Sequence, residues 1–226
     1  QGILTRTGKG YNTKVFMDDC FEFVISPNPD AAMPDLFHII VNNRGAYMTQ
    51  SRQNTANCAW APEFEAAGNV ENNIWTYEIA FPLAQFGITQ WQDGEAIGLR
   101  ICRNWKRLST GDFGQSSWSQ IRGTFFDSGN MPRVTLKNGA PVVRFLSLRN
   151  ESGADLKVGI FNPDGKTREL KLQYFHQPIN SQSINLEDRL RLAPGESKVI
   201  NLPVAQITPE ESVQTAFRVS DENNEP

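Results

Sequence analysis

The chain has 226 residues, of which 39% are hydrophobic and 21% are charged, and its formal net charge at pH 7 is -3. Such a length and composition suit a water-soluble globular protein with one large β domain or two smaller domains. Acidic and basic residues are mixed along the whole chain, which argues against nucleic acid as the main partner. No apolar run reaches the length of a membrane span, which argues against a transmembrane segment.

Apolar residues at every second position predict antiparallel β-strands through the first part of the chain. The first strand, within residues 15–25, places Phe21, Phe23 and Ile25 on one face. Residues 36–48 are predicted to form a strand that is interrupted by a turn at Gly45. Further strands are predicted over residues 73–81, 96–105, 116–120 and 133–137. Because Pro82 cannot donate to a sheet, the strand before it ends there, and the next residues are predicted to form a single helical turn.

A break in this pattern at residues 137–141 predicts a domain boundary, and all five Trp residues precede it. Short strands separated by Gly, Pro and Asn turns follow, which is typical of a small β-sandwich. These strands are predicted over residues 142–150, 154–162, 169–177, 185–204 and 213–221. The sequence therefore predicts an all-β chain of two antiparallel β-sandwich domains, residues 1–139 and 140–226, with a disordered tail after Ser220.

No group of residues typical of a catalytic site is found, so we expect no enzymatic activity in this chain. A Ser-His-Asp triad needs one of the two histidines, His38 and His176, which fall in different predicted domains. His176 is expected at the surface or in a turn. Asp18 and Asp19 are adjacent and would point to opposite faces of a strand, so they cannot flank one glycosidic bond from the same side.

The chain has three cysteines, an odd number, so at least one is unpaired or pairs outside the chain. Cys20 and Cys102 lie within predicted strands, where they are either buried thiols or a disulfide between neighbouring strands. No Cys or His spacing typical of a zinc site occurs.

Aromatic residues offer one candidate for a binding site. A sugar stacks its C–H faces on aromatic rings while its hydroxyls bind polar side chains. Aromatic residues at strand ends or in loops are suited to such a platform; they are Phe16, Trp60, Trp91, Trp105, Trp118, Phe125 and Phe126. The alternative, which is the more common use of aromatic residues in a β-sandwich, is the core, and we assign Trp75 and Trp118 to it.

Six sequence segments occur in the order seen in family 9 carbohydrate-binding modules and their relatives. They are DDCFEFVI, HIIVNNRGAYM, WTYEIAFPLAQFG, GEAIGLRICRNW, SSWSQ and FFDSGNMPRVTL. Residues 16–136 therefore resemble this family, which implies an antiparallel β-sandwich in which residues 79–87 are a strand and its cap. Members of the family begin with further strands that are absent from this chain, so a sheet edge of the sandwich would be exposed. The resemblance therefore implies that an upstream segment of a larger protein, or another chain, supplies the missing strands.

The resemblance also implies a sugar site, in which two aromatic rings hold a terminal sugar beside a Glu and polar strand residues. The two ring positions fall on Phe16 and Phe125, and the Glu falls on Glu22. Some members of the family bind calcium through loop carboxylates. The candidates for calcium are Asp18, Asp19 and Asp127, and the alternative is that these acids stabilise turns.

At other positions the match to the family's site is weaker, and two hydrogen-bonding partners are lost, at Ile40 and Cys102. The basic strand position falls on Ile40, which offers a sugar no hydrogen bond. A polar strand position falls on Cys102 and a polar loop position on Arg122. Three neighbouring residues would compensate for lost hydrogen bonds: Arg100, Asn104 and His38. The candidate carbohydrate-binding residues are Phe16, Glu22, Arg100, Cys102, Arg122 and Phe125.

These features predict a non-catalytic, glycan-binding region of a larger, multidomain extracellular or cell-surface protein, without a cofactor other than calcium. The alternatives are a structural or interaction module of a cell-surface or matrix protein whose sugar site has decayed, and an accessory module of a polysaccharide-degrading enzyme. Residues 140–226 resemble the generic immunoglobulin-like modules that often act as spacers in large secreted bacterial proteins, and fold alone gives them no function.

Overall fold

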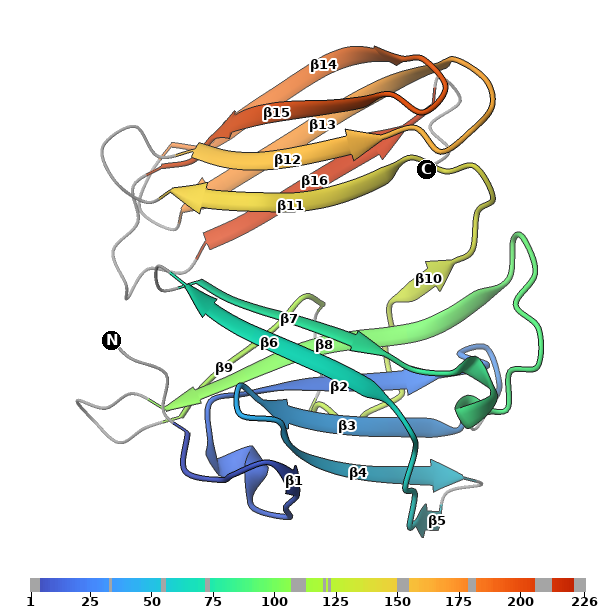
Figure 1. Ribbon diagram of the computed structural model, residues 1–226, viewed down its shortest axis with the longest axis vertical. Coiled ribbons are helices and arrows are strands. Elements are labelled where there is room, and N and C mark those ends of the chain that lie inside the picture. Colours follow the sequence, from blue (N-terminus) through green and yellow to red (C-terminus); the bar gives the residue numbers. More distant parts are fainter. Residues whose placement is uncertain are drawn as a thin grey trace. The chain divides into compact units, whose positions relative to one another are not determined.

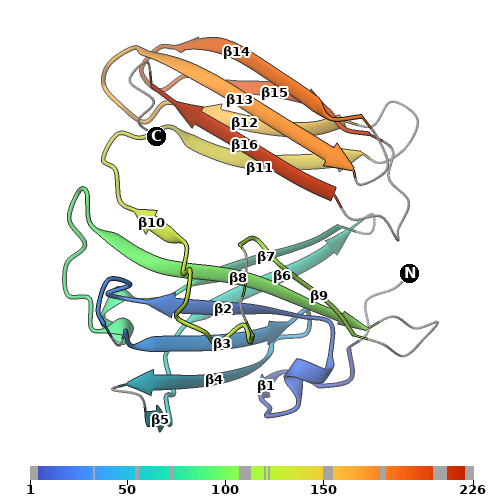
Figure 2. The same ribbon diagram turned by 180° about the vertical axis from the view of Figure 1, so that it is seen from behind.

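The computed structural model of the chain consists of β-strands and two single-turn 3₁₀ helices, with no α-helix among the described residues (Figure 1, and Figure 2 from behind). This confirms the prediction of an all-β chain. The structure describes residues 5–32, 34–53, 56–71, 74–106, 113–119, 121, 123–149, 155–178, 182–205 and 213–221. The chain divides into two compact units between Leu136 and Lys137, slightly before the predicted boundary. Except for Asp221, the tail that is predicted to be disordered lies outside the described residues.

The first unit is built on one large sheet. Its strands are β1 (Gly10–Tyr11), β2 (Cys20–Ser26), β3 (Leu36–Asn42), β4 (Ala46–Gln53), β5 (Ala56–Cys58), β8 (Ala96–Lys106), β9 (Phe113–Ser117) and β10 (Arg133–Thr135). They follow the order β1-β4-β3-β2-β8-β10, with β5 paired to β4 and β9 paired to β8. The central pairs β4-β3, β3-β2 and β2-β8 are antiparallel, so side chains at directly opposite positions share one face of the sheet.

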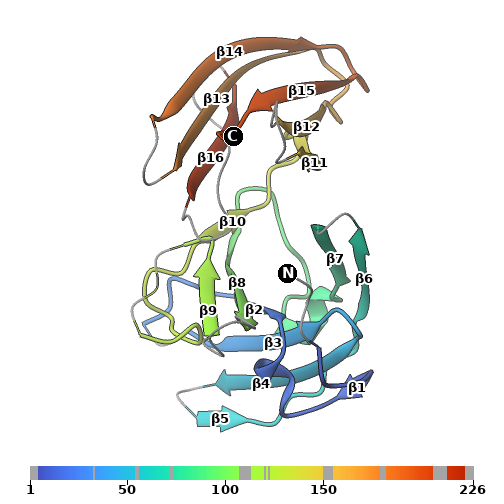
Figure 3. The ribbon, with the colours of Figure 1, turned by 90° about the vertical axis from the view of Figure 1, so that its left-hand side faces the viewer.

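A second, two-stranded sheet lies against one face of the large sheet (Figure 3). It is a hairpin formed by β6 (Glu65–Glu71) and β7 (Ile74–Ala80). Phe21 and Phe23 of β2 face this hairpin, as their alternation predicts, and they belong to one apolar cluster with Tyr77 and Ile79 of β7. Trp75 is half-buried and its ring centroid lies 4.5 Å from that of Phe21. The first apolar core therefore lies between the hairpin and β2, β3 and β4.

The predicted helical turn after Pro82 is the 3₁₀ turn η2 (Leu83–Phe86). Phe86 is 5% exposed, and its ring centroid lies 5.4 Å from that of Phe37 on β3. Gly87 ends the turn with a left-handed backbone, φ 75°, which glycine adopts without steric cost. The apolar turn thus closes one end of the core.

The hairpin covers only part of the large sheet. Residues 65–70 of β6 are exposed, whereas Tyr77 of β7 is half-buried. On the facing sheet, Phe23 of β2 and Leu99 of β8 are also only half-buried. Among the described residues β7 pairs only with β6, so its other edge carries backbone groups that no described strand pairs.

Two local predictions for the first unit are wrong. Residues 15–17 form a 3₁₀ turn, η1 (Val15–Met17), instead of the start of the predicted strand. Trp118 is 55% exposed, so its assignment to the core does not hold.

The described residues of the second unit form two three-stranded antiparallel sheets. Its strands are β11 (Val142–Arg149), β12 (Asp155–Phe161), β13 (Arg168–Pro178), β14 (Ile184–Leu192), β15 (Ser197–Pro203) and β16 (Val213–Ser220). One sheet has the order β11-β12-β15 and the other has the order β14-β13-β16. The two sheets form the layers predicted from the strand pattern, and the immunoglobulin-like identity of this unit stays a prediction.

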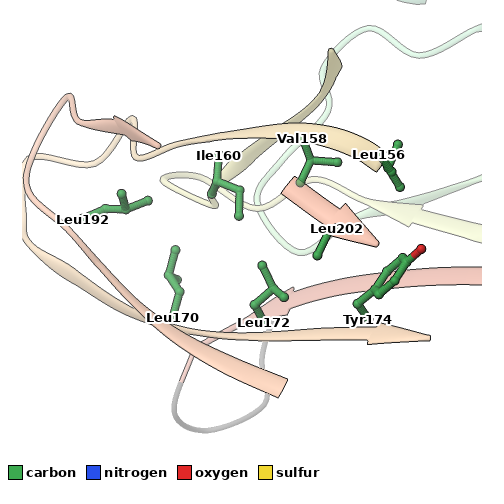
Figure 4. Close-up of a cluster of buried hydrophobic side chains, with 8 residues drawn as sticks. All are labelled: Leu156, Val158, Ile160, Leu170, Leu172, Tyr174, Leu192 and Leu202. Carbon is green, nitrogen blue, oxygen red and sulfur yellow. The ribbon is translucent and has the colours of Figure 1, made fainter. Parts of the chain in front are cut away.

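Side chains at alternate positions of these strands point between the two sheets and pack into one apolar core. Figure 4 shows the buried side chains that fill the space: Leu156, Val158, Ile160, Leu170, Leu172, Tyr174, Leu192 and Leu202. His176 continues the same face of β13 and is 3% exposed, with its Nδ1 2.9 Å from Oγ1 of Thr215. The expectation that His176 lies at the surface is therefore wrong.

Candidate functional site

The face of the large sheet that points away from the hairpin carries several buried polar side chains. On β2, Glu22 lies directly between Ile40 of β3 and Cys102 of β8. His38 lies one diagonal step away on β3, and Asn104 lies one diagonal step away on β8. Strand pairing therefore brings residues from distant parts of the sequence to one patch of the sheet.

Five polar side chains on this face form one continuous line of hydrogen bonds across the sheet. Gln50 Nε2 donates to His38 Nδ1 at 2.9 Å, and His38 Nε2 donates to Glu22 Oε2 at 2.7 Å. Asn104 Nδ2 donates to Glu22 Oε1, and Gln115 Nε2 donates to Asn104 Oδ1 at 3.0 Å. An amide nitrogen can only donate, so His38 accepts at Nδ1 and carries its hydrogen on Nε2. We call these residues the polar row: Gln50, His38, Glu22, Asn104 and Gln115.

The centre of the polar row is buried and its ends reach solvent. Glu22, His38 and Asn104 are each 5% exposed, whereas Gln50 is half-buried and Gln115 is exposed. The buried carboxylate accepts two hydrogen bonds, which offset the cost of removing it from water. The row is thus a fixed polar structure, with Gln115 as the amide nearest to solvent.

On the same face, Arg100 forms hydrogen bonds with the backbone of the loop at residues 125–129. It is fully buried, and its Nη1 donates to the carbonyl oxygens of Phe125 at 3.0 Å and Asp127 at 2.5 Å. Its Nη2 donates to the carbonyl oxygen of Gly129 at 2.7 Å. In this structure, Arg100 therefore holds the backbone of residues 125–129 in place through three hydrogen bonds.

The aromatic residues of this loop lie against the sheet. Phe125 is 7% exposed. The ring of Phe126 stacks on His38, with centroids 5.1 Å apart and planes at 19°, and the guanidinium carbon of Arg52 lies 5.0 Å from the Phe126 centroid. The loop thus shields the middle of the polar row, and a stacking role for Phe125 would require the loop to move.

Phe16 has the opposite character. It is 48% exposed on η1, next to Val15, which is fully buried in a cluster with Cys20 and Ile40. The described ring contacts and hydrogen bonds do not link Phe16 to Glu22 directly. The structure therefore groups Glu22 with Arg100 and Cys102 on one face of the sheet, places Phe125 in the loop that Arg100 holds, and leaves Phe16 as an exposed ring. Arg122 lies outside the described residues.

Cys20 and Cys102 are free thiols, so the alternative of a disulfide between them is wrong. Burial raises the pKa of Cys20 to about 12 and that of Cys102 to about 11. Both thiols therefore stay protonated at neutral pH, and neither has the thiolate character of a reactive cysteine.

Asp18 joins the start of the described chain to the sheet. It is fully buried, and its carboxylate accepts hydrogen bonds from the backbone nitrogens of Arg6 and Thr7, both at 3.0 Å. The Thr7 hydroxyl and Asn42 Nδ2 donate to the same carboxylate, the latter at 2.9 Å. Burial by itself would raise the pKa of Asp18, but these hydrogen bonds together bring it below its usual value.

The candidate calcium ligands show turn and anchoring contacts. Asp127 Oδ1 accepts a hydrogen bond from the backbone nitrogen of Gly129 at 3.0 Å, which is a turn contact. The described residues contain no group of three or more His, Cys, Asp or Glu side chains placed to hold a metal ion. Calcium binding stays a prediction.

Two residues of the polar row, Gln50 and Gln115, were not found from the sequence. Gln50 follows from the pairing of β3 with β4, which places it opposite His38. Gln115 follows from the pairing of β8 with β9, which places it opposite Asn104.

Comparison of the chain with protein-family models, with curated proteins and with solved structures gave no match. None of the described helices has the length and apolar character needed to span a membrane.

Proposed function

We propose that this chain is a non-catalytic glycan-binding region, with its site at the solvent end of the polar row. The observation that carries the proposal is the row itself, in which five planar polar side chains from five adjacent strands form one hydrogen-bonded line. Sugar hydroxyls both donate and accept hydrogen bonds, and rigid amide and carboxylate groups are well suited to recognise them.

The resemblance to family 9 carbohydrate-binding modules adds support from the sequence. It implies that Glu22 is a sugar ligand and Phe16 a stacking ring, and Phe16 is the more exposed of the two ring candidates. In this proposal Asn104 and Gln115 take over hydrogen bonds that Ile40 and Cys102 no longer offer. We place the chain in a larger extracellular or cell-surface protein, because that is where such modules act.

The variant Gln115→Ala tests the proposal. Loss of one hydrogen bond to a sugar costs about 1.4 kcal/mol, so the affinity for the glycan selected in a binding panel should fall about tenfold, as measured by titration calorimetry. The matched control is Gln92→Ala, at an exposed glutamine outside the polar row, which should leave the affinity unchanged. Equal affinities for both variants would contradict a site at the polar row.

A second candidate function is that of an interaction module, and the unpaired edge of β7 favours it. We propose that a polypeptide strand, from a preceding segment of a longer chain or from a separate chain, pairs with this edge. Such a strand would cover the half-buried Phe23 and Leu99.

Amide hydrogen exchange tests this second candidate. In the chain alone, β7 amides that point away from β6 should exchange fast, whereas amides of β3, which has neighbours on both sides, should be protected. A hexapeptide of alternating Val and Thr, added at millimolar concentration, should slow exchange in β7 only. Full protection of β7 without peptide, or no slowing with it, would rule the strand pairing out.

A further inference from the structure

The other face of the large sheet carries an open cleft that the polar row does not use. It lies between the hairpin and the edge formed by β1 and β4, elements that can be followed in Figure 3. Its volume is about 390 Å³, and it is lined by Lys9, Gly45, Tyr47, Pro62, Glu63, Phe64, Ala66 and Tyr77. Tyr47 alternates with Met48 and Gln50 along β4, so the cleft and the polar row lie on opposite faces of the sheet.

Three aromatic rings form the walls of the cleft. Tyr47, Phe64 and Tyr77 are each half-buried, so part of every ring is open to the cleft. The rings of Tyr47 and Phe64 meet edge to face with centroids 5.1 Å apart, and Phe64 in turn packs on Phe81 at 5.1 Å. Tyr11, 59% exposed, packs edge to face on Tyr47 at 5.8 Å. These contacts hold the rings of Tyr47 and Phe64 in place before any ligand arrives.

Small residues and two opposite charges complete the cleft. Gly45 and Ala66 carry no large side chain that would fill it. Lys9 and Glu63 line it from exposed positions, and no ion pair is formed between either of them and a described residue. Lys9 offers hydrogen-bond donors and Glu63 offers acceptors, while their charges cancel.

We infer that this cleft is a second ligand site, which takes a neutral pyranose sugar of one or two rings. The ring walls suit the C–H faces of a pyranose, and the donor and acceptor side chains suit its hydroxyls. The volume lies at the lower end of the range of small-molecule sites, which fits a mono- or disaccharide. This inference does not rest on the polar row, because no residue is shared between the two sites.

The inference is tested by NMR titration of the chain with methyl glucopyranoside, methyl galactopyranoside, methyl mannopyranoside and cellobiose at millimolar concentration. At least one of these sugars should shift the ring signals of Tyr47, Phe64 and Tyr77. The variants Glu63→Gln and Lys9→Gln should each weaken that binding at least fivefold. Glu65→Gln, an exposed neighbour that does not line the cleft, is the matched control and should leave it unchanged.

The variant Gln115→Ala separates this inference from the proposed function, because it should leave binding in the cleft intact. Sugars that shift only polar-row signals would overturn the inference and support the proposed function. The absence of any shift in the three rings, or shifts that survive both charge variants at full affinity, would also overturn it.

Discussion

The variant Arg100→Met is expected to lower the free energy of unfolding of the first unit by about 3 kcal/mol or more. Hydrogen bonds to charged groups contribute about 1.5–3 kcal/mol each, and their loss is not additive. Methionine fills a similar volume but leaves the carbonyl groups of Phe125, Asp127 and Gly129 without the donors that now hold them. Urea denaturation followed by Trp fluorescence measures the change.

Arg103→Met on the same strand is the matched control. Arg103 is exposed, and its guanidinium carbon lies 5.5 Å from the Trp105 ring centroid. An exposed contact of this kind contributes about 0.5–1 kcal/mol, so this variant should be destabilised far less. Similar unfolding free energies for the two variants would mean that Arg100 does not hold the loop as the structure shows.

The variant Asp18→Ala is expected to destabilise the first unit by about 2–4 kcal/mol at pH 7, because it leaves several buried or partly buried donors without their acceptor. The pKa of Asp18 is lower in the folded protein than its ordinary value of 3.8, so the carboxylate stabilises the fold above that pH. The contribution is lost as the pH falls through the lower, folded pKa. Denaturation of both proteins from pH 7 down to about pH 3 measures it.

The difference in stability between the two proteins should therefore shrink below about pH 4. Asp30→Ala is the control, since Asp30 forms an exposed ion pair with Arg133 and such pairs contribute about 0–1 kcal/mol. A difference that stays constant across the pH range would contradict the role assigned to the Asp18 carboxylate.

Much of the fold follows from local patterns in the sequence. The alternation in β2 and the turn around Pro82 predict their structures because each depends on neighbouring residues alone. Strand β6 was not predicted, since its Ala-Ala-Gly-Asn stretch has low β propensity and is held by pairing with β7. Trp118 was misassigned because the strand pattern ends at Ser117, one residue before it.

The candidate site is less accessible from the sequence. The resemblance led to Glu22, and the turn at Gly45 sets the pairing that places Gln50 opposite His38. Gln115 cannot be found from the sequence, because the connection from β8 to β9, residues 107–112, does not fix the register of their pairing. The contacts of Arg100 cannot be predicted from the sequence either, because its partners are backbone carbonyl groups 25 to 29 residues away. Every residue type has such a carbonyl group, so the sequence does not mark these partners.

The measurement that tests the central claim most directly is an NMR titration of the chain with the tightest-binding member of a panel of neutral, acidic and sulfated glycans. If the polar row binds the glycan, the side-chain amide signals of Gln115 and Asn104 and the ring signals of His38 will shift and saturate together. If no glycan in the panel binds, or if the bound glycan shifts only signals away from these residues, the polar row is not a glycan site.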